Sequence, residues 1–328
     1  MKQPPSALPI HRLGTDPVVR FACSELARYW AAMTGMRLPV RAARRYEPGA
    51  PGFWVGLAAD FETPARETDG SDDVVFVQAE RGHAILSGAN PRSVLYAVYR
   101  YLEKQGCRWF RPGPGGERVP RVADPWACPV ALLEIPSARH RCICMEGACS
   151  DRHVRDMIDY AAKRGFNAYF TQFRNAYTFY QRWYGVETRR GRPPAPFSSA
   201  RALAYQEKAK REALRRGLLL HTVGHGWTCE PFGIRGEEWA PTKQAIPATI
   251  RPFLALLNGH RDLHKRIPLN TQLCYSQPRV RRIVTEAIVA YAKAHPHEAI
   301  IHFWLADGSN NHCECPACRK ARPSDWYV

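Results

Sequence analysis

Residues 140–174, HRCICMEGACSDRHVRDMIDYAAKRGFNAYFTQFR, decide the fold class of this 328-residue chain. The segment begins with the alternating HRCICMEG (140–147), which is typical of a short strand. The amphipathic run that follows predicts a helix over 150–165, and NAYFTQFR (167–174) then predicts a second strand. A strand, a helix and a strand of these lengths indicate a βαβ unit with parallel strands.

The same alternation continues toward the C-terminus. Further helices are predicted at 198–217 and 278–296, and further strands at 218–227, 269–276 and 299–308. Long loops follow the carboxyl ends of these strands, where the active sites of (β/α)8 barrels lie. We therefore predict an α/β fold in which residues 138–328 form a partial (β/α)8 TIM barrel with about five strands. Because such a barrel closes through eight strands, we also expect the chain to be truncated.

Residues 1–135 are expected to form a separate small α/β accessory domain. A helix is predicted to begin near Ser24, which serves as its N-cap. Two strands, 72–80 and 83–89, are expected to pair across a two-residue turn. The segment 93–106 then places its apolar residues on one face of a helix that is suited to packing on a sheet.

Composition limits the classes of partner. The formal net charge is +17, but Arg outnumbers Lys about four to one and is spread along the whole chain, so we expect no nucleic-acid partner. No apolar run is long enough to span a bilayer or to resemble a signal peptide, which favours a cytoplasmic protein without a membrane partner unless a leader was removed. Eleven cysteines, an odd number, favour a reduced compartment. The sequence contains no pattern from which the oligomeric state could be predicted.

Several motifs carry a family resemblance. Residues 87–120, SGANPRSVLYAVYRYLEKQGCRWFRPGPGGERVP, resemble the accessory α/β domain of α-glucuronidases and of family 20 β-hexosaminidases. GHGWTCEPFGI (224–234), LNTQLCYSQP (269–278) and the segment 304–328 resemble the domain of unknown function 4838 family, which is placed among glycosidase-like barrels. The resemblance implies a glycoside hydrolase that acts on an oligo- or polysaccharide by carboxylate acid/base chemistry. It therefore implies a carbohydrate as the substrate.

Asp307 is the first candidate for a catalytic carboxylate, because glycoside hydrolysis usually needs two carboxyl groups that flank the bond. It ends the predicted strand 299–308, directly before Gly308. Strand alternation alone points Asp307 toward the helices, so we expect a bulge at Ala306 to turn it into the barrel. The alternative is that Asp307 only caps the following turn.

Glu146 and Glu230 are the other two catalytic candidates. Glu146 alternates with Cys142 and Cys144 on one face of the first strand, which would place it inside a barrel. Its alternative is an ion pair with an arginine such as Arg174. Glu230 follows the third strand and is close in sequence to candidate sugar-binding residues. Its alternative is a loop residue in solvent.

Polar and aromatic residues near the strand ends are candidates for substrate binding. Aromatic rings pack on the apolar faces of sugars, while imidazole, amide and hydroxyl groups hydrogen-bond sugar hydroxyls. The candidates are His225, Trp227, Tyr275, Trp304, Asn310 and Asn311. A structural role is an equally good interpretation for His225.

HCECPAC contains the densest group of metal ligands: His312, Cys313, Cys315 and Cys318. The spacing from Cys315 to Cys318 is typical of a zinc knuckle, and a distant ligand such as Cys149 or Cys229 would complete the site. A local disulfide and free thiols are the alternatives. Hydrolysis requires no cofactor, so a zinc ion here would be structural.

Three functions remain open at this point. The first is a glycoside hydrolase. The second is a non-catalytic carbohydrate-binding protein or an inactive fragment, which the missing barrel strands favour. The third is a metal-binding interaction module, which HCECPAC and the positive charge favour.

Overall fold

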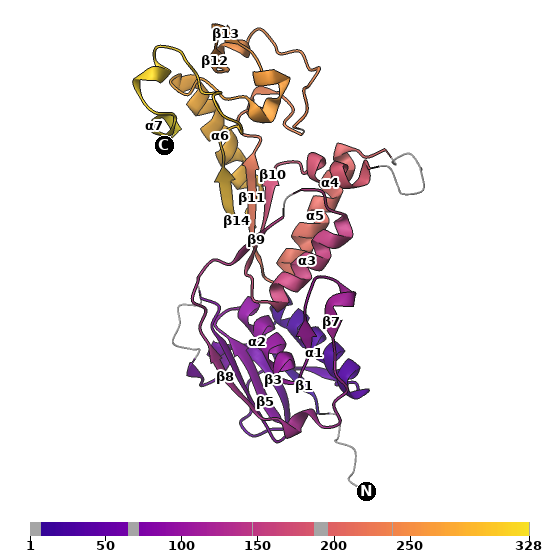
Figure 1. Cartoon of the computed structure of the whole chain (residues 1–328). Coiled ribbons are helices and arrows are strands. Elements are labelled where there is room, and N and C mark those ends of the chain that lie inside the picture. The colour runs from indigo at the N-terminus through magenta and orange to yellow at the C-terminus, as the bar shows by residue number, and fades with distance from the viewer. Residues whose placement is uncertain (1–7, 65–71, 146, 187–195, 238, 328) are drawn as a thin grey trace. The chain divides into compact units, whose positions relative to one another are not determined.

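A computed structural model describes five stretches of the chain (Figure 1), residues 8–64, 72–145, 147–186, 196–237 and 239–327. They form two compact units that interleave in sequence. The first unit contains the described residues of Met1–Ile143, Arg152–Ala168 and Lys210–Leu218, and the second those of Cys144–Asp151, Tyr169–Ala209 and Leu219–Val328.

The first unit is built on a six-stranded mixed sheet with the order β2-β1-β3-β5-β4-β8. Parallel pairing joins β1 to β2 and to β3, and β3 to β5, whereas β4 pairs antiparallel with β5 and β8. The strands are β1 (Ile10–Leu13), β2 (Val40–Ala43), β3 (Gly52–Leu57), β4 (Val75–Glu80), β5 (His83–Gly88) and β8 (Val130–Glu134). A short ribbon, β6 (Arg108–Trp109) and β7 (Glu117–Arg118), lies outside this sheet.

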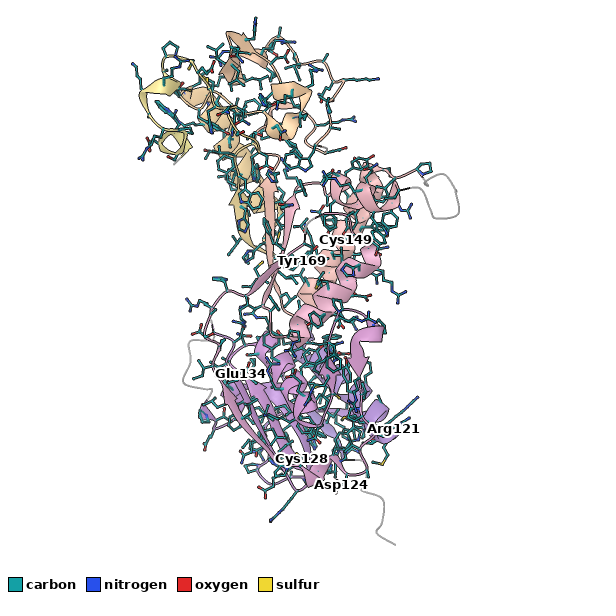
Figure 2. All side chains as sticks on the ribbon, in the orientation of Figure 1. Arg121, Asp124, Cys128, Glu134, Cys149 and Tyr169 are labelled. Carbon is teal, nitrogen blue, oxygen red and sulfur yellow. The ribbon has the colours of Figure 1, made fainter. Side chains whose placement is uncertain are left out.

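Two helices, α1 (Pro17–Thr34) and α2 (Pro91–Lys104), pack on each other and on this sheet, and their side chains fill the space between them (Figure 2). The predicted apolar face of α2 is confirmed, since Val94, Val98 and Leu102 are fully buried. The predicted strand pair is also confirmed. Its turn residues, Arg81 and Gly82, both have positive φ, as a tight two-residue hairpin requires.

The predicted start of α1 was wrong. The helix begins at Pro17, and its N-cap is Asp16, whose carboxylate accepts hydrogen bonds from the N–H groups of Val18 (2.7 Å) and Val19 (3.3 Å). Pro17 suits the first helical position because its missing N–H needs no partner there. Ser24 lies inside the helix, and its hydroxyl donates to the Phe21 carbonyl.

Helical segments from later in the chain join the first unit through a buried charge network. Lys163, only 2% exposed, contacts the carboxylates of Glu117 and Asp159. Arg216 donates to Asp159 over 2.9 Å. A buried ammonium group needs such partners, because desolvating an unpaired charge is costly.

The second sheet has the order β14-β11-β10-β9, and β11 runs parallel to β14. Its strands are β9 (Cys142–Cys144), β10 (Ala168–Phe173), β11 (Leu219–His225) and β14 (Glu298–Phe303). The helices in this part of the chain are α3 (Asp151–Lys163), α4 (Tyr177–Tyr184), α5 (Ser199–Arg215), α6 (Pro278–Ala294) and α7 (Pro323–Tyr327), and a small ribbon comprises β12 (Leu256–Leu257) and β13 (His260–Arg261). Together the two units confirm the predicted α/β class.

The predicted strand 269–276 is not a strand of this sheet, so the sheet has four described strands and not five. The segment instead starts in a 3-10 turn, and Leu273 makes one isolated bridge to Leu254. Leu269 and Leu273 are buried in a core cluster with Phe253 and Val280. The apolar residues of this segment therefore pack in the core, whereas the sequence pattern predicted that they would belong to a strand of the sheet.

Within the described ranges, no helix combines the length and the apolar character needed to cross a membrane.

Candidate functional site

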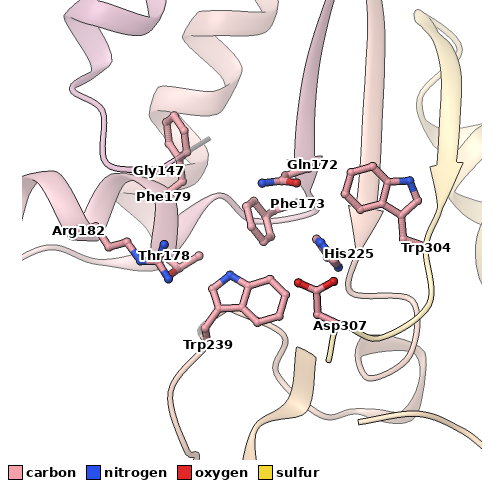
Figure 3. A pocket seen from close by; sticks show the side chains of 10 residues that line it. All are labelled: Gly147, Gln172, Phe173, Thr178, Phe179, Arg182, His225, Trp239, Trp304 and Asp307. Atoms are coloured by element: carbon pink, nitrogen blue, oxygen red, sulfur yellow. The ribbon is translucent and has the colours of Figure 1, made fainter. Parts of the chain in front are cut away.

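A pocket of about 270 Å³ opens in the second unit, beyond the carboxyl ends of β10, β11 and β14 (Figure 3). Strand ends contribute residues 172, 173 and 225, the helix α4 contributes one side, and loops contribute the rest. The lining residues are Gly147, Gln172, Phe173, Thr178, Phe179, Arg182, His225, Trp239, Trp304 and Asp307. Three of the predicted site residues, His225, Trp304 and Asp307, therefore come together here.

His225 is buried among three aromatic side chains of this pocket. Its ring stacks on Phe173 at 5.6 Å and meets Trp239 and Trp304 edge to face at 5.0 and 4.8 Å between ring centroids. The site thus joins one polar ring to two large indoles, which offers a ligand both a hydrogen-bonding group and apolar faces.

The backbone of β11 explains how Trp304 can pack so closely. Gly224 has φ +77°, and a Cβ atom at this position would lie 3.1 Å from the Trp304 ring and 3.0 Å from the carbonyl oxygen of Gln172. Only glycine fits both the conformation and the contact. Val223, next to it, also has positive φ, 69°, which is rare for a β-branched residue and marks local strain at the strand end.

Asp307 reaches the pocket without the predicted bulge. The strand β14 ends at Phe303, so the alternation of side chains does not extend to residue 307. The Asp307 N–H donates to the Leu269 carbonyl over 3.0 Å, and its own carbonyl accepts from the Asn311 side chain over 2.7 Å. Backbone contacts hold the loop, and Figure 3 shows the carboxylate pointing into the pocket on the side of His225.

Glu230 does not line this pocket. Its carboxylate Oε2 lies 3.0 Å from Nε of Arg174, so the interpretation as a solvated loop residue was wrong. Burial raises the pKa of Glu230 to about 7; the charge of Arg174 lowers it and that of Glu237 raises it further. A carboxyl group with such a pKa could exchange a proton near neutral pH. Glu146, the remaining catalytic candidate, lies outside the described residues.

Three of the predicted substrate-binding residues are buried and are not among the residues that line the pocket. Trp227 is fully buried and its indole N–H donates to the His302 carbonyl over 2.8 Å, so its ring offers no face to a ligand. Tyr275 belongs to the buried core cluster. Asn311 is also fully buried, and its amide donates to the carbonyls of Asp307 and Asn270. Asn310 is exposed, has φ 57°, and does not line the pocket.

Sequence reasoning missed most of the pocket wall. Phe173 ends a strand that was predicted, so the rule that polar and aromatic residues cluster at strand ends could have found it. Trp239 lies in an irregular loop and Arg182 lies on α4, a helix that was not predicted. No periodic pattern marks either residue, because their positions depend on how the loop and the helix pack.

The predicted metal-ligand set needs correction. Among the described residues, the group that could hold a metal ion is Cys274, Cys313, Cys315 and Cys318. His312 is exposed and is not in this group. The proposed distant ligands, Cys149 and Cys229, are also not in it; Cys229 is buried in the core cluster that contains Tyr275.

Residues 197–325 match the family model described as "Domain of unknown function (DUF4838)". This confirms the resemblance predicted from the sequence for that part of the chain. The DUF4838 segment contains His225, Trp239, Trp304 and Asp307, and it contains all four clustered cysteines.

Solved structures of glycoside hydrolases share the fold. The GH20 β-N-acetylhexosaminidase from Streptomyces coelicolor A3(2) superposes with a TM-score of 0.52 at 17% identity, over 90% of this chain and 55% of that chain. The GH20 exo-β-N-acetylglucosaminidase from Vibrio harveyi gives a TM-score of 0.51 at 11% identity, over 96% and 46%. The chain thus spans about half the length of the solved proteins it matches. No curated protein matches the chain in sequence.

Proposed function

We propose that the DUF4838 segment is part of a glycoside hydrolase whose catalytic domain is a (β/α)8 barrel, and that the pocket around His225 binds the sugar. The observation that carries the proposal is the position of Asp307, a carboxylate that lines the same pocket as two indole rings, beyond the carboxyl ends of β11 and β14. In barrel enzymes the catalytic groups lie at that end of the strands.

The strand order supports a partial barrel. Neighbours in the sheet β9-β10-β11-β14 follow the order of the chain, with helices in the connections between them. Consecutive strands that pair side by side through helical crossovers are what a (β/α)8 barrel requires. The accessory role of residues 1–135 and the domain boundary near 138 are parts of the same proposal.

The pocket residues divide into two chemical roles. Trp239 and Trp304 offer apolar faces to a pyranose ring, and Gln172, Thr178 and Arg182 offer hydrogen-bonding groups to its hydroxyls. Asp307 is the carboxylate proposed to act at the glycosidic bond, by donating a proton to the leaving oxygen or by stabilising the positive charge that develops on the sugar.

An N-acetylated sugar is the substrate class we propose. Asp307 is the one carboxylate among the described residues that line the pocket, whereas most glycosidases use two. In substrate-assisted hydrolysis the acetamido group of the substrate replaces the second carboxylate as nucleophile. The two solved proteins described above are named for action on N-acetylated hexosides, which supports the same class.

Turnover of 4-nitrophenyl glycosides tests the proposal. We expect the β-N-acetylglucosaminide to be hydrolysed faster than the β-glucoside or the β-glucuronide, and Asp307→Asn to abolish the difference. Equal rates for wild type and Asp307→Asn on every substrate would exclude Asp307 from the chemistry.

A non-catalytic carbohydrate-binding protein is the second candidate, and the single described carboxylate of the pocket favours it. Calorimetric titration with N-acetylglucosamine and its oligomers separates the two functions. Saturable binding without turnover at any pH from 4 to 9 would establish the second.

A further inference from the structure

The sulfur atoms of four cysteines converge in the second unit. Cys274 comes from the segment that follows the bridge at Leu273, while Cys313, Cys315 and Cys318 come from the loop near the C-terminus. All four sulfur atoms lie within 4.8 Å of one another. The short spacing within CECPAC therefore supplies three thiols, and the fold adds a fourth from about forty residues earlier.

We propose that these four thiolates bind one structural zinc ion. Sulfur atoms at about 2.3 Å from a tetrahedral zinc lie roughly 3.8 Å from one another. The sulfur of Cys274 lies 3.6 Å from that of Cys315 and 3.8 Å from that of Cys318, which is close to this spacing. A disulfide requires its two sulfur atoms to be about 2 Å apart, which is shorter than these distances. It would also join only two of the four cysteines.

Hydrogen-bond donors surround the cluster in the way that thiolate ligands require. The N–H of Leu256 points at the sulfur of Cys313 over 3.3 Å, and the N–H of Cys318 points at that of Cys315 over 3.4 Å. The guanidinium of Arg261 lies 4.0 Å from Cys313 Sγ. Four thiolates around Zn²⁺ carry a net charge of −2, so donors and a nearby cation stabilise the complex.

Burial also favours a metal site. Cys274, Cys315 and Cys318 are buried, and Cys313 is half-buried. Few regular elements support them, because the segment after Asp307 contains only bends, turns, the 3-10 helix Cys318–Lys320 and the short helix α7 among its described residues. A metal ion can replace the missing apolar core of such a segment, since its binding free energy contributes directly to folding.

The zinc would fasten the loop that carries Asp307 to the segment before α6. On the same two segments, the Glu314 N–H donates to the Leu256 carbonyl over 2.8 Å, and the amide of Gln272 donates to the Ala306 carbonyl over 3.0 Å. The zinc would therefore have a structural role, and it would hold the segment that contributes Asp307 to the pocket. The inference concerns metal binding alone and stands whether or not the protein is a glycosidase.

Elemental analysis of the full chain, purified without chelators, tests the proposal. We expect about one zinc ion per chain. Cys274→Ser should lower the zinc content to background and lower the melting temperature. His312→Ala, which changes a neighbouring exposed residue, and Cys128→Ser, which changes an exposed thiol of the first unit (Figure 2), should both retain the metal.

A spectroscopic measurement keeps the test decisive if Cys274→Ser does not fold. Cobalt(II) added to the wild-type protein after zinc removal should give the intense visible bands of tetrahedral coordination and sulfur-to-cobalt charge transfer. Three results would each overturn the proposal. The first is the absence of both zinc and the cobalt spectrum, and the second is iron in place of zinc. The third is a disulfide between two of these cysteines in the mass spectrum of the protein as purified.

Discussion

The carboxylate of Glu230 lies 3.0 Å from the guanidinium of Arg174, yet burial raises the pKa of Glu230 to about 7. An adjacent cation normally lowers the pKa of a carboxyl group, so desolvation dominates at this position. The pair packs over Gly226, where a Cβ atom would lie 3.0 Å from Glu230 Oε1. A carboxyl group with this pKa changes its protonation near neutral pH, although Glu230 itself is not part of the pocket wall.

Replacing Glu230 by Gln should change how stability depends on pH. The pKa is about 7 in the folded chain and has an ordinary value of 4.5, so the folded state binds more protons between these values. The resulting stabilisation is complete below pH 4.5 and is lost as the pH rises through 7. Glu230→Gln removes this loss. Urea denaturation at pH 4.5, 6 and 8 should show the wild type declining relative to the variant.

Glu286→Gln is the matched control, because Glu286 is exposed on α6. It should follow the wild-type profile at all three pH values. If the difference in unfolding free energy between the wild type and Glu230→Gln stayed constant from pH 4.5 to pH 8, the raised pKa would be contradicted.

Replacing Asp307 by Asn should lower kcat by about 10²–10⁴-fold toward the N-acetylated substrate, as expected for loss of a general acid. The fold should persist, because the backbone groups of Asp307 and not its carboxylate hold the loop. Circular dichroism and the melting temperature check this. Asp325→Asn, which alters an exposed carboxylate near the C-terminus, should keep the wild-type rate.

Replacing Trp304 by Ala should weaken sugar binding, whereas replacing an exposed tryptophan should not. Trp304 lines the pocket, so we expect Trp304→Ala to weaken N-acetylglucosamine binding about tenfold, which corresponds to one sugar–aromatic contact. Trp183→Ala, which removes an exposed indole on α4, should leave the affinity unchanged. Equal affinities of the wild type, Trp304→Ala and Trp183→Ala in calorimetric titration would exclude Trp304 as a sugar-binding residue.

Trp227→Ala should act on stability. The indole is fully buried and donates a hydrogen bond to the His302 carbonyl, so its removal leaves a cavity and loses that bond. We expect a loss of about 3–5 kcal/mol in the free energy of unfolding. A variant that melts like the wild type but no longer binds sugar would restore Trp227 as a substrate platform.

The N-cap of α1 can be tested in the first unit. Asp16→Ala should lower the free energy of unfolding by about 1 kcal/mol, since it removes the acceptor for two N–H groups. Ser24→Ala, in the helix interior, should change it by less than about 0.5 kcal/mol. If Ser24→Ala cost more than Asp16→Ala in chemical denaturation, the helix would begin where the sequence pattern predicted.

Local patterns were predictive where neighbours in sequence decide the structure. The apolar spacing of 93–106 predicted both the helix α2 and its buried face, and the turn at Arg81 predicted the pairing of β4 with β5. The helix start was wrong because Pro17 was not recognised as a first helical residue. The segment 269–276 failed because an apolar run has the same composition in a strand and in an irregular core segment.

Within the candidate site, the sequence alone determined that His225 and Asp307 lie near the carboxyl ends of strands of an α/β fold, and parallel strands bring these ends to one edge of a sheet. It also determined that Cys313, Cys315 and Cys318 lie close together, because five residues cannot separate them far. Tertiary structure alone decided that Trp239 lines the pocket while Trp227 is buried, and that Cys274 is the fourth thiol. These contacts join segments whose spacing in sequence carries no periodic signal, so only the packing of long loops on the sheet brings them together.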